Sequence, residues 1–264
     1  MLRPESFTSI GVFKQCPKRY YYKYIKSLKR ELENEKIKKG REFHKNVCEG
    51  KKSSDELDFA YQIKGVDRKK TSWFVKDVGK LVYLRKDKNF IEFNEARFAL
   101  NYKMQVVEYC DPRAIFRGVV DHAKIFLEKE KLIREIEGKK ELLLENFFKN
   151  VELLDWKTGK NKGGHIQLNY YALFFFAQFS FLDKISCKNV YVSCQETSPS
   201  WVIKRKQIEK IWLKLKGEIK KIRECRKFVK KTSPLCAFCE YKKDVCNKEL
   251  LGKKVEGLFV ERKN

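Results

Sequence analysis

The alternation of apolar and polar positions changes its period along the chain, and each change predicts a different kind of element. Residues 40–111 favour helices, with a polar break at residues 51–55. Residues 114–126 are rich in β-branched and aromatic side chains, which is typical of paired strands. Residues 127–150 are highly charged and predict a helix or a long hairpin inserted before the next strand. The pattern therefore predicts helices first and a sheet that begins near residue 114.

The two ends of the chain carry further signals for helices and strands. Thr8 or Ser9 can cap a first short helix, and Pro17 can open a second. Beyond the charged insert, we expect a strand at 151–157, a loop at 157–164, a helix from about 165 to 182, strands at 189–195 and 201–204, and a basic helix at 207–230. The alternation of helices and strands predicts an α/β protein.

The charge balance of the chain is strongly basic. Lysine and arginine together number 60 against 35 aspartates and glutamates, which gives a net charge of +25. An excess of this size indicates an anionic partner and attracts nucleic acid through counterion release. Because 42% of the residues are hydrophobic, the chain can still form a proper core, and wholesale disorder is excluded.

Neither a membrane span nor a secretion signal is expected. The most apolar run, residues 165–182, is interrupted by polar side chains at Gln167, Asn169, Gln178 and Ser180. A transmembrane helix needs about 20 consecutive apolar residues. The first residues show no apolar segment followed by a small-residue cleavage site. These features predict an intracellular, cytoplasmic protein.

Nine cysteines in a reducing compartment favour buried, reactive or metal-bound thiols over disulfides. Cys236, Cys239 and Cys246 form a Cys-x2-Cys-x6-Cys pattern in a short loop that contains proline, and Cys16 is the best candidate for a fourth ligand because Pro17 follows it. On spacing alone, zinc and a 4Fe-4S cluster both fit four thiolates. The remaining cysteines are expected to be ordinary small core residues: Cys48, Cys110, Cys187, Cys194 and Cys225.

Charged residues at predicted strand ends suggest a catalytic site. Asp155 and Lys157 lie two apart on a strand, so their side chains emerge on the same face. Asp121 ends the preceding strand and adds a second carboxylate, and His44 follows Gly40 at the start of a helix. Two carboxylates and an imidazole suit Mg²⁺ or Mn²⁺, and a lysine beside them can handle phosphate charge. Taken singly, Asp121 could be a turn residue and His44 a core histidine.

One helix contributes two more candidates. Gln167 and Tyr171 share a helical face through their i,i+4 spacing. Their ordinary explanation is packing and hydrogen bonding in a tyrosine-rich core helix.

The ordered motifs resemble the RecB-like branch of the PD-(D/E)XK nucleases, which includes CRISPR-associated RecB-like exonucleases and AddB-type nuclease domains. The chain departs from the family name in having Asp155 where a glutamate is common, a form that many RecB-like members share. The resemblance covers nearly the whole chain, in the order Cys16-Pro-Lys-Arg-Tyr20, Gly40-x3-His44, Gly118-x2-Asp121, Asp155-Trp-Lys-Thr-Gly159, Gln167-x3-Tyr171 and the cysteines at 236, 239 and 246.

The resemblance implies a fold and a division of the chain. The expected fold is a restriction-endonuclease-like core in which helices flank a mixed central sheet. Residues 1–264 would form a single RecB-like nuclease domain with a helical insertion or cap at 51–110. A cysteine loop at 232–250 would be joined to Cys16 by the metal centre.

The resemblance also implies a chemistry. His44, Asp121, Asp155 and the carbonyl of Trp156 would hold Mg²⁺ or Mn²⁺ against the scissile phosphate. Lys157 would position or activate the attacking water, and Gln167 and Tyr171 would support Lys157 and the phosphate. A 4Fe-4S cluster on Cys16, Cys236, Cys239 and Cys246 would act as a structural clasp, with zinc as the alternative cofactor.

The expected function is therefore a deoxyribonuclease, an exonuclease on single-stranded DNA or DNA ends, rather than a sequence-specific endonuclease. The resemblance implies a role in repair, recombination, CRISPR adaptation or viral genome processing, which all use this scaffold. DNA is the expected partner, and a helicase or another processing protein is a second candidate. Because Gly-x4-Gly-Lys-Ser/Thr is absent, the chain is not expected to be a helicase itself. Two other interpretations stay open: an inactive DNA-binding or scaffold subunit of a helicase-nuclease type complex, and a nucleic-acid binder with a zinc-based interaction module.

Overall fold

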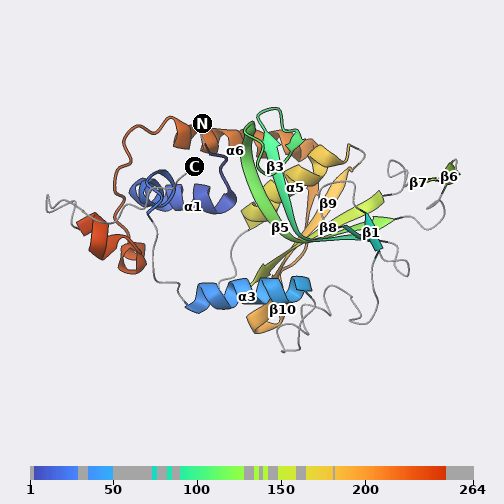
Figure 1. Cartoon of the computed structure of the whole chain (residues 1–264), viewed down its shortest axis with the longest axis horizontal. Coiled ribbons are helices and arrows are strands. Elements are labelled where there is room, and N and C mark those ends of the chain that lie inside the picture. Colours follow the sequence, from blue (N-terminus) through green and yellow to red (C-terminus); the bar gives the residue numbers. More distant parts are fainter. Residues whose placement is uncertain are drawn as a thin grey trace.

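A mixed sheet forms the centre of the protein in a computed structural model, with helices on both sides (Figure 1). The structure describes residues 3–28, 35–49, 73–75, 82–84, 90–127, 134–136, 139–141, 148–158, 165–180 and 182–247. Strands follow one another across the sheet in the order β1-β2-β3-β5-β8-β9-β10, with β4 paired to β3 and β11 paired to β9. The long strands are β3 (Phe90–Asn101), β5 (Ala114–Leu127), β8 (Phe148–Lys157) and β9 (Lys184–Tyr191).

Both strand orientations occur in this sheet. Strand β5 lies antiparallel between β3 and β8, whereas β8 and β9 run parallel. The parallel pair needs a crossover, which helix α5 (His165–Gln178) supplies. The expectation of an α/β fold with a mixed central sheet and flanking helices is confirmed. The short strands are β1 (Trp73–Val75), β2 (Val82–Leu84), β4 (Val106–Val107), β10 (Glu196–Thr197) and β11 (Trp201–Lys204).

Helix α5 packs its aromatic side chains against one face of the sheet. Phe174 and Phe175 are fully buried, and Phe174 stacks on Phe98 of β3 and on Phe116 of β5. Helix α6 (Ile208–Arg223) packs on α5, and α1 (Phe7–Gln15) reaches the same core through Phe7, whose ring contacts Tyr170. The main hydrophobic core therefore lies between the sheet and these helices.

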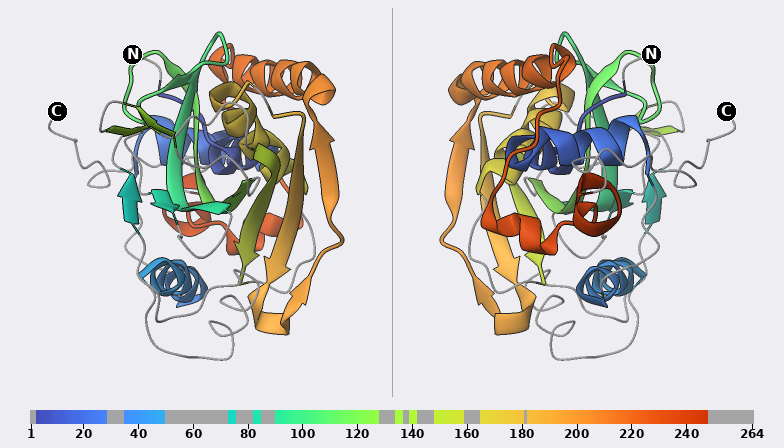
Figure 2. Two further views of the ribbon diagram at one scale, coloured as in Figure 1. Left: turned by 90° about the vertical axis from the view of Figure 1, so that its right-hand side faces the viewer. Right: turned by 90° about the vertical axis from the view of Figure 1, so that its left-hand side faces the viewer.

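Helix α3 (Glu35–Glu49) lies on the opposite side of the sheet from α5 and α6 (Figures 1 and 2). Its Gly40 approaches Thr158 just beyond the end of β8: a Cβ built on Gly40 would lie 3.2 Å from Thr158 Oγ1. This close approach favours glycine at position 40. The helix thus presents His44, one turn later, to the end of the central strands.

The N-terminal and C-terminal segments lie beside each other (Figure 1). Helix α2 (Pro17–Tyr20) begins at Pro17, as expected, and continues as a π-helical turn, η1 (Tyr21–Ile25). The C-terminal elements are two short helical segments, η5 (Pro234–Phe238) and η6 (Lys242–Cys246). A small cluster of apolar side chains from both ends, Tyr22, Leu28, Tyr241 and Val245, forms a second core.

Several predicted elements are wrong or have different bounds. Residues 90–101 and 106–107 are strands rather than helices, so the sheet begins before residue 114 and the helical prediction for 51–110 fails there. Most of the remaining residues of that predicted cap lie outside the described ones. Residues 114–127 form one strand instead of two, and the first helix is capped by Ser6 rather than Thr8 or Ser9.

The charged insert contains a hairpin, one of the two predicted forms: β6 (Arg134–Ile136) pairs antiparallel with β7 (Lys139–Glu141). Helices α5 and α6 end earlier than expected, at Gln178 and Arg223, and β9 begins at Lys184 rather than at residue 189. The predicted strand at 201–204 is confirmed as β11. Among the described helices, none is long and apolar enough to span a bilayer.

Candidate metal and catalytic site

The two central aspartates lie on neighbouring strands where the strand pairing stops. The last registered pair between β5 and β8 joins His122 to Leu154, so Asp121 and Asp155 come directly after it. Asp121 Oδ2 accepts a hydrogen bond from the Trp156 backbone N–H at 2.9 Å and so spans the gap between the strands. The structure brings the two aspartates together, but Asp121 lies in the middle of β5 and not at the end of a strand as predicted, because β5 continues to Leu127.

Burial raises the pKa of both carboxyl groups. For Asp121 the negative charge of Asp155 raises the pKa further, to well above its ordinary value. For Asp155 the ammonium of Lys157 opposes the effect of burial. Two adjacent carboxylates in a buried place bind a cation well, because a divalent ion offsets their mutual repulsion.

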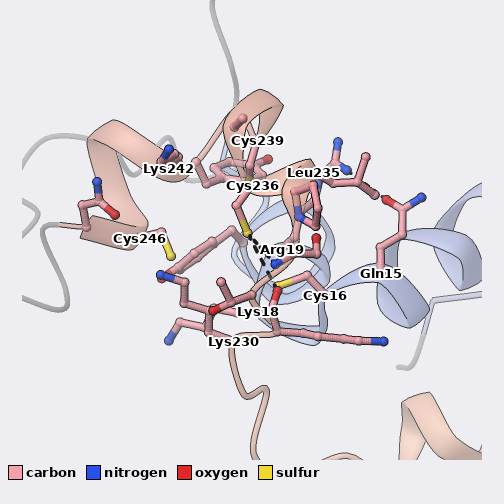
Figure 3. A pocket seen from close by; sticks show the side chains of 18 residues that line it. Gln15, Cys16, Lys18, Arg19, Lys230, Leu235, Cys236, Cys239, Lys242 and Cys246 are labelled. Carbon is pink, nitrogen blue, oxygen red and sulfur yellow. Dashed lines mark hydrogen bonds between the residues drawn. The ribbon is translucent and has the colours of Figure 1, made fainter.

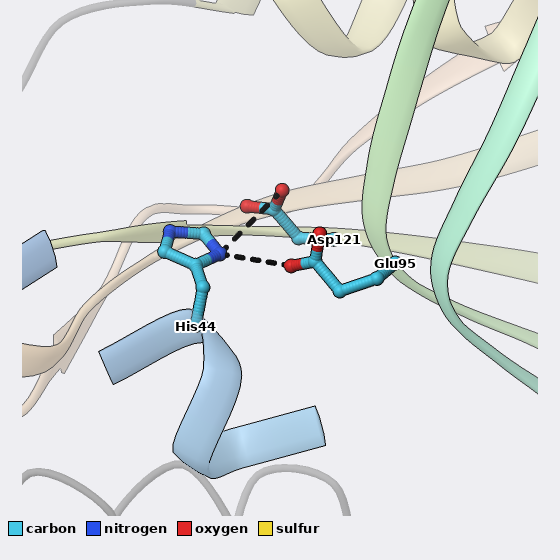
Figure 4. A group of neighbouring side chains, drawn as sticks. All are labelled: His44, Glu95 and Asp121. Atoms are coloured by element: carbon cyan, nitrogen blue, oxygen red, sulfur yellow. Dashed lines mark hydrogen bonds and ion pairs between the residues drawn. The ribbon is translucent and has the colours of Figure 1, made fainter. Parts of the chain in front are cut away.

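His44 and Glu95 face Asp121 from other elements. His44 Nδ1 lies 3.1 Å from Glu95 Oε1 and 3.8 Å from Asp121 Oδ1 (Figure 4). One ligand atom from each of these three residues lies within 4.8 Å of the other two. Carboxylate oxygens and an imidazole nitrogen are donors that suit a hard divalent cation such as Mg²⁺ or Mn²⁺. The residues present therefore fit the metal that the sequence predicts. This group contains Glu95 and not the expected ligand Asp155, whose oxygens bond to Lys157 and Gln167.

Burial lowers the pKa of His44, but the hydrogen bond with Glu95 and the charges of the nearby carboxylates outweigh it, so the pKa is raised overall. The imidazole thus faces a strongly negative environment. A metal cation and an imidazolium compete for that environment, because a histidine must be neutral to act as a ligand.

Glu95 is the functional candidate that sequence reasoning missed. It lies on β3 opposite Asp121, between the registered pairs Asn94–His122 and Ala96–Val120. Its backbone has a φ of 48°, an uncommon conformation for a residue other than glycine. Strained backbone of this kind clusters at functional sites. Because residues 90–101 were predicted to be helical, no strand pairing with Asp121 could be anticipated.

Lys157, Asp155, Gln167 and Tyr171 form one network. Lys157 Nζ makes an ion pair with Asp155 Oδ2 and donates to Gln167 Oε1 at 3.0 Å. Gln167 Nε2 donates to Asp155 Oδ1 at 2.9 Å and to the Tyr171 hydroxyl at 3.1 Å. Gln167 therefore fixes both the ammonium and the carboxylate. The i,i+4 spacing on α5 brings these side chains to the strand end, as the sequence indicated.

Glycine at position 118 is explained by the position of Tyr171. A Cβ on Gly118 would lie 2.7 Å from Tyr171 Cε1, a distance that side chains do not tolerate. Because the tyrosine ring is buried against β5, it can shift little. Gly118 thus lets α5 approach the sheet closely enough for Gln167 and Tyr171 to reach Asp155 and Lys157.

The predicted cysteine ligands gather at the junction of the chain ends. Cys16, Cys236, Cys239 and Cys246 all line one cavity of about 390 Å³ (Figure 3). All four are free thiols and partly exposed. Basic side chains line the same cavity and can offset the charge of bound thiolates: Lys18, Arg19, Lys230, Lys231 and Lys242. The four residues therefore fit a group held by thiolates, as the spacing predicts.

Contacts outside the cysteines hold the same junction together. Arg19 makes an ion pair with Glu240 at 2.7 Å and donates hydrogen bonds to it through Nε and Nη2. The Tyr241 hydroxyl donates to the Leu28 carbonyl at 3.2 Å, and its ring lies 5.4 Å from that of Tyr22. These contacts bring Cys16 and the three C-terminal cysteines to one place.

The other two histidines of the chain, His122 and His165, have structural contacts. His122 is fully buried with its Nδ1 2.9 Å from Asn94 Oδ1, and His165 packs edge-on against Trp201. Of the expected metal ligands, Trp156 contributes its backbone N–H to Asp121, and its ring packs beside His122. Gly159, the last residue of the motif that begins at Asp155, lies outside the described residues.

Comparison with known families agrees with this arrangement. The model of the PD-(D/E)XK nuclease superfamily matches residues 4–247, which include every residue of the two sites above. A search of the curated proteins gave no match.

Proposed function

The chain belongs to the PD-(D/E)XK nuclease superfamily, and we propose that it is a RecB-like member that removes nucleotides from single-stranded DNA or DNA ends. Membership of this superfamily indicates that the protein is a metal-dependent nuclease. The network that joins Asp121, Asp155, Lys157 and Gln167 to His44 and Glu95 is the observation that carries the proposal. The net charge of +25 agrees with a DNA substrate.

His44, Asp121 and Asp155, with the carbonyl of Trp156, would hold the divalent ion, and we add Glu95 to this set because its carboxylate meets His44 and Asp121. When bound, the ion offers Lewis-acid stabilisation of the phosphate charge and a lowered pKa of bound water. The protein positions this chemistry through β5, β8, β3 and α3, which bring together residues as far apart as 44 and 155.

Lys157 would hold the attacking water and offset the charge of the scissile phosphate. Its ammonium is only partly exposed and is held between Asp155 and Gln167, so it points into the site instead of into solvent. Gln167 keeps the ammonium in this position, and Tyr171 keeps Gln167 in place. A preorganised cation of this kind acts without reorganising during the reaction.

The test is cleavage of end-labelled single- and double-stranded DNA in Mg²⁺ or Mn²⁺. We expect Lys157→Ala to lower the cleavage rate at least about 100-fold, the usual effect of losing one preorganised electrostatic group. Lys188→Ala is a matched control: Lys188 lies on the neighbouring strand β9, pairs with Glu152, and its side chain has the same exposed fraction of 26%. The control should cleave at the wild-type rate.

Two outcomes would overturn the proposal. Wild-type protein that shifts DNA but never shortens it with either metal would be a binding or scaffold subunit. Equal cleavage by wild type and a folded Lys157→Ala variant would place the activity elsewhere. Labels on the 5′ or the 3′ end separate exonuclease from endonuclease products in the same experiment.

We also propose that the cysteine cavity holds a 4Fe-4S cluster. Tetrahedral zinc with thiolates at about 2.3 Å requires sulfur atoms only about 3.8 Å apart. Among the described residues, no three cysteine sulfurs lie within 4.8 Å of one another, although all four line one cavity. A cluster spreads its thiolates over separate iron atoms, so the wider spacing favours the cluster over zinc.

Iron and acid-labile sulfide in anaerobically purified protein test this assignment. We expect a brown protein with both, and loss of colour in Cys239→Ser. Cys225→Ser is the matched control, because Cys225 lies outside the cavity and its thiol donates to the Lys227 carbonyl. A colourless wild-type protein that carries zinc would contradict the cluster.

A further inference from the structure

Two arginines and a tyrosine form a cationic group on the sheet, at a distance from the site described above. Arg97 on β3 and Arg117 on β5 both lie over the ring of Tyr109, at 5.7 and 5.3 Å from its centroid. Arg97 is exposed, and Arg117 and Tyr109 are half-buried. Each guanidinium gains from the face of the ring, so the tyrosine holds two like charges near each other.

The strand register and the packing of Gly118 place this group on the face of the sheet that points away from α5. Paired residues of antiparallel strands point to the same side, and the register pairs Arg97 with Val119 and Ala99 with Arg117. Gly118 faces Tyr171 of α5, so its neighbours Arg117 and Val119 point to the opposite face of the sheet. Helix α3 lies on that side, and its His44 approaches Asp121 from there. Residues 116, 118 and 120 are buried, whereas Arg117 and Val119 are half-buried. The face with the arginines is therefore the accessible one.

Among the described residues, neither arginine side chain has an anionic partner. In the part of the chain that the structure describes, neither guanidinium makes an ion pair or a hydrogen bond. Arg113, which begins the same strand region, differs: Asp111 holds it in a bidentate pair. Two guanidiniums without carboxylates are suited to phosphate, which the planar fork of arginine binds through paired hydrogen bonds.

We infer that Arg97, Tyr109 and Arg117 bind the sugar-phosphate backbone of the nucleic-acid strand whose scissile phosphate lies at Asp121. This inference rests on the proposed function. Four residues of β5 separate Arg117 from Asp121, about 13 Å of strand, which corresponds to about four stacked nucleotides at roughly 3.4 Å each. The group therefore contacts the strand several nucleotides from the cleavage point and sets the length of strand that binds tightly.

The test measures binding without cleavage. Fluorescence anisotropy in excess chelator compares single strands of about four and about twelve nucleotides, because only the longer strand spans the distance to Arg117. We expect Arg97→Ala/Arg117→Ala to weaken binding of the longer strand on the order of tenfold and to leave the shorter one nearly unchanged. The slope of log K against log salt should fall by about 1.4 for two lost phosphate contacts on a single strand.

The matched control removes the same charge elsewhere. Lys210 and Lys214 are exposed on α6, which packs on the far side of α5 from the sheet. Lys210→Ala/Lys214→Ala should keep the dependence on strand length. If the alanine pair lowers the melting temperature, Arg97→Lys/Arg117→Lys replaces it, because lysine keeps the charge but loses the fork and the stacking.

The outcomes separate this inference from the proposed function. If Arg97→Ala/Arg117→Ala binds the short and the long strand with the same affinities as Lys210→Ala/Lys214→Ala, the inference is wrong. This holds even when wild-type protein cleaves DNA. Suppose that Arg97→Ala/Arg117→Ala weakens binding of the longer strand alone, while wild-type protein never cleaves in Mg²⁺ or Mn²⁺. The inference about the arginines is then supported, and the nuclease proposal fails.

Discussion

At the scale of single residues, the site consists of carboxyl groups whose ionised forms destabilise the fold unless a bound cation offsets their charge. Asp121 and Asp155 are adjacent carboxyls whose pKa values burial raises, and Glu95 adds a third acid with a strained backbone. The sequence identified Asp121, Asp155, Lys157 and His44 because their motifs lie at predicted strand and helix ends. It could not identify Glu95, since a positive φ and a cross-strand neighbour leave no trace in local residue spacing.

Replacing Asp121 by asparagine should stabilise the metal-free protein while it removes activity. A folded-state pKa above the unfolded value of about 3.9 means that ionised Asp121 destabilises the fold as pH rises through the raised value. Asparagine can still accept from the Trp156 N–H and carries no charge. We expect a melting temperature higher on the order of 2–4 °C at neutral pH. The gain should vanish in acid, where Asp121 is protonated; a lower melting temperature at neutral pH would contradict this account.

Glu95→Gln should weaken metal binding. Glutamine keeps the size and a hydrogen-bond acceptor for His44 but removes the charge beside Asp121. We expect the Mn²⁺ affinity, measured by calorimetry, to fall about 10- to 100-fold, as for residues that support metal ligands. Glu152→Gln on β8 is the control, because Glu152 pairs with Lys188 and not with the site. Equal affinities for the two variants would remove Glu95 from the metal site.

At the scale of elements, close approach decides the geometry. Gly118 leaves room for Tyr171 of α5, and Gly40 of α3 leaves room for Thr158. Each glycine therefore lets one of the two helices approach the central strands closely. The sequence marked both glycines as parts of motifs and predicted α5, β8 and β11 well, because their patterns are clear. It failed at β3: Glu95, Ala96, Arg97 and Leu100 are good helix formers, and sheet pairing with β5 overrides that preference.

Gly118→Ala should disturb the site through Tyr171. The new Cβ would meet the buried ring at 2.7 Å and force α5 away from β5. Overpacking of this kind costs about 1–3 kcal/mol, which thermal unfolding should detect. Gly217→Ala on α6 is the control, because a Cβ there meets nothing within 4 Å. Cleavage should fall more in Gly118→Ala than in the control; an unchanged melting temperature and rate would mean that α5 tolerates the shift.

At the scale of the whole molecule, the described N-terminal and C-terminal segments meet at the cysteine cavity, while the catalytic residues lie at the sheet. The Arg19–Glu240 pair and the Tyr241–Leu28 hydrogen bond already join the ends. A cluster on Cys16 and the C-terminal cysteines would close the chain across most of its length, and restricting the unfolded chain is how such crosslinks stabilise a fold. The sequence predicted that Cys16 joins the C-terminal cysteines, because the spacing of cysteines and the position of Pro17 can be read without a structure.

Loss of the cluster should lower stability before it affects chemistry. Cys239→Ser removes one thiolate ligand, and we expect a melting temperature lower by several degrees, together with loss of bound iron. The residual folded protein should still bind Mn²⁺, because His44, Glu95 and Asp121 lie on other elements. Cys225→Ser should melt as wild type does. Simultaneous loss of iron and of Mn²⁺ binding in folded protein would show that the two sites depend on each other.

The central claim is that residues distant in sequence hold one divalent ion beside Lys157. The most direct measurement is an anomalous difference map from crystals of the protein grown with Mn²⁺. The account predicts a peak in contact with the side chains of His44, Glu95, Asp121 and Asp155. A well-ordered crystal that shows no peak among these side chains, or shows the ion bound elsewhere, would contradict the account.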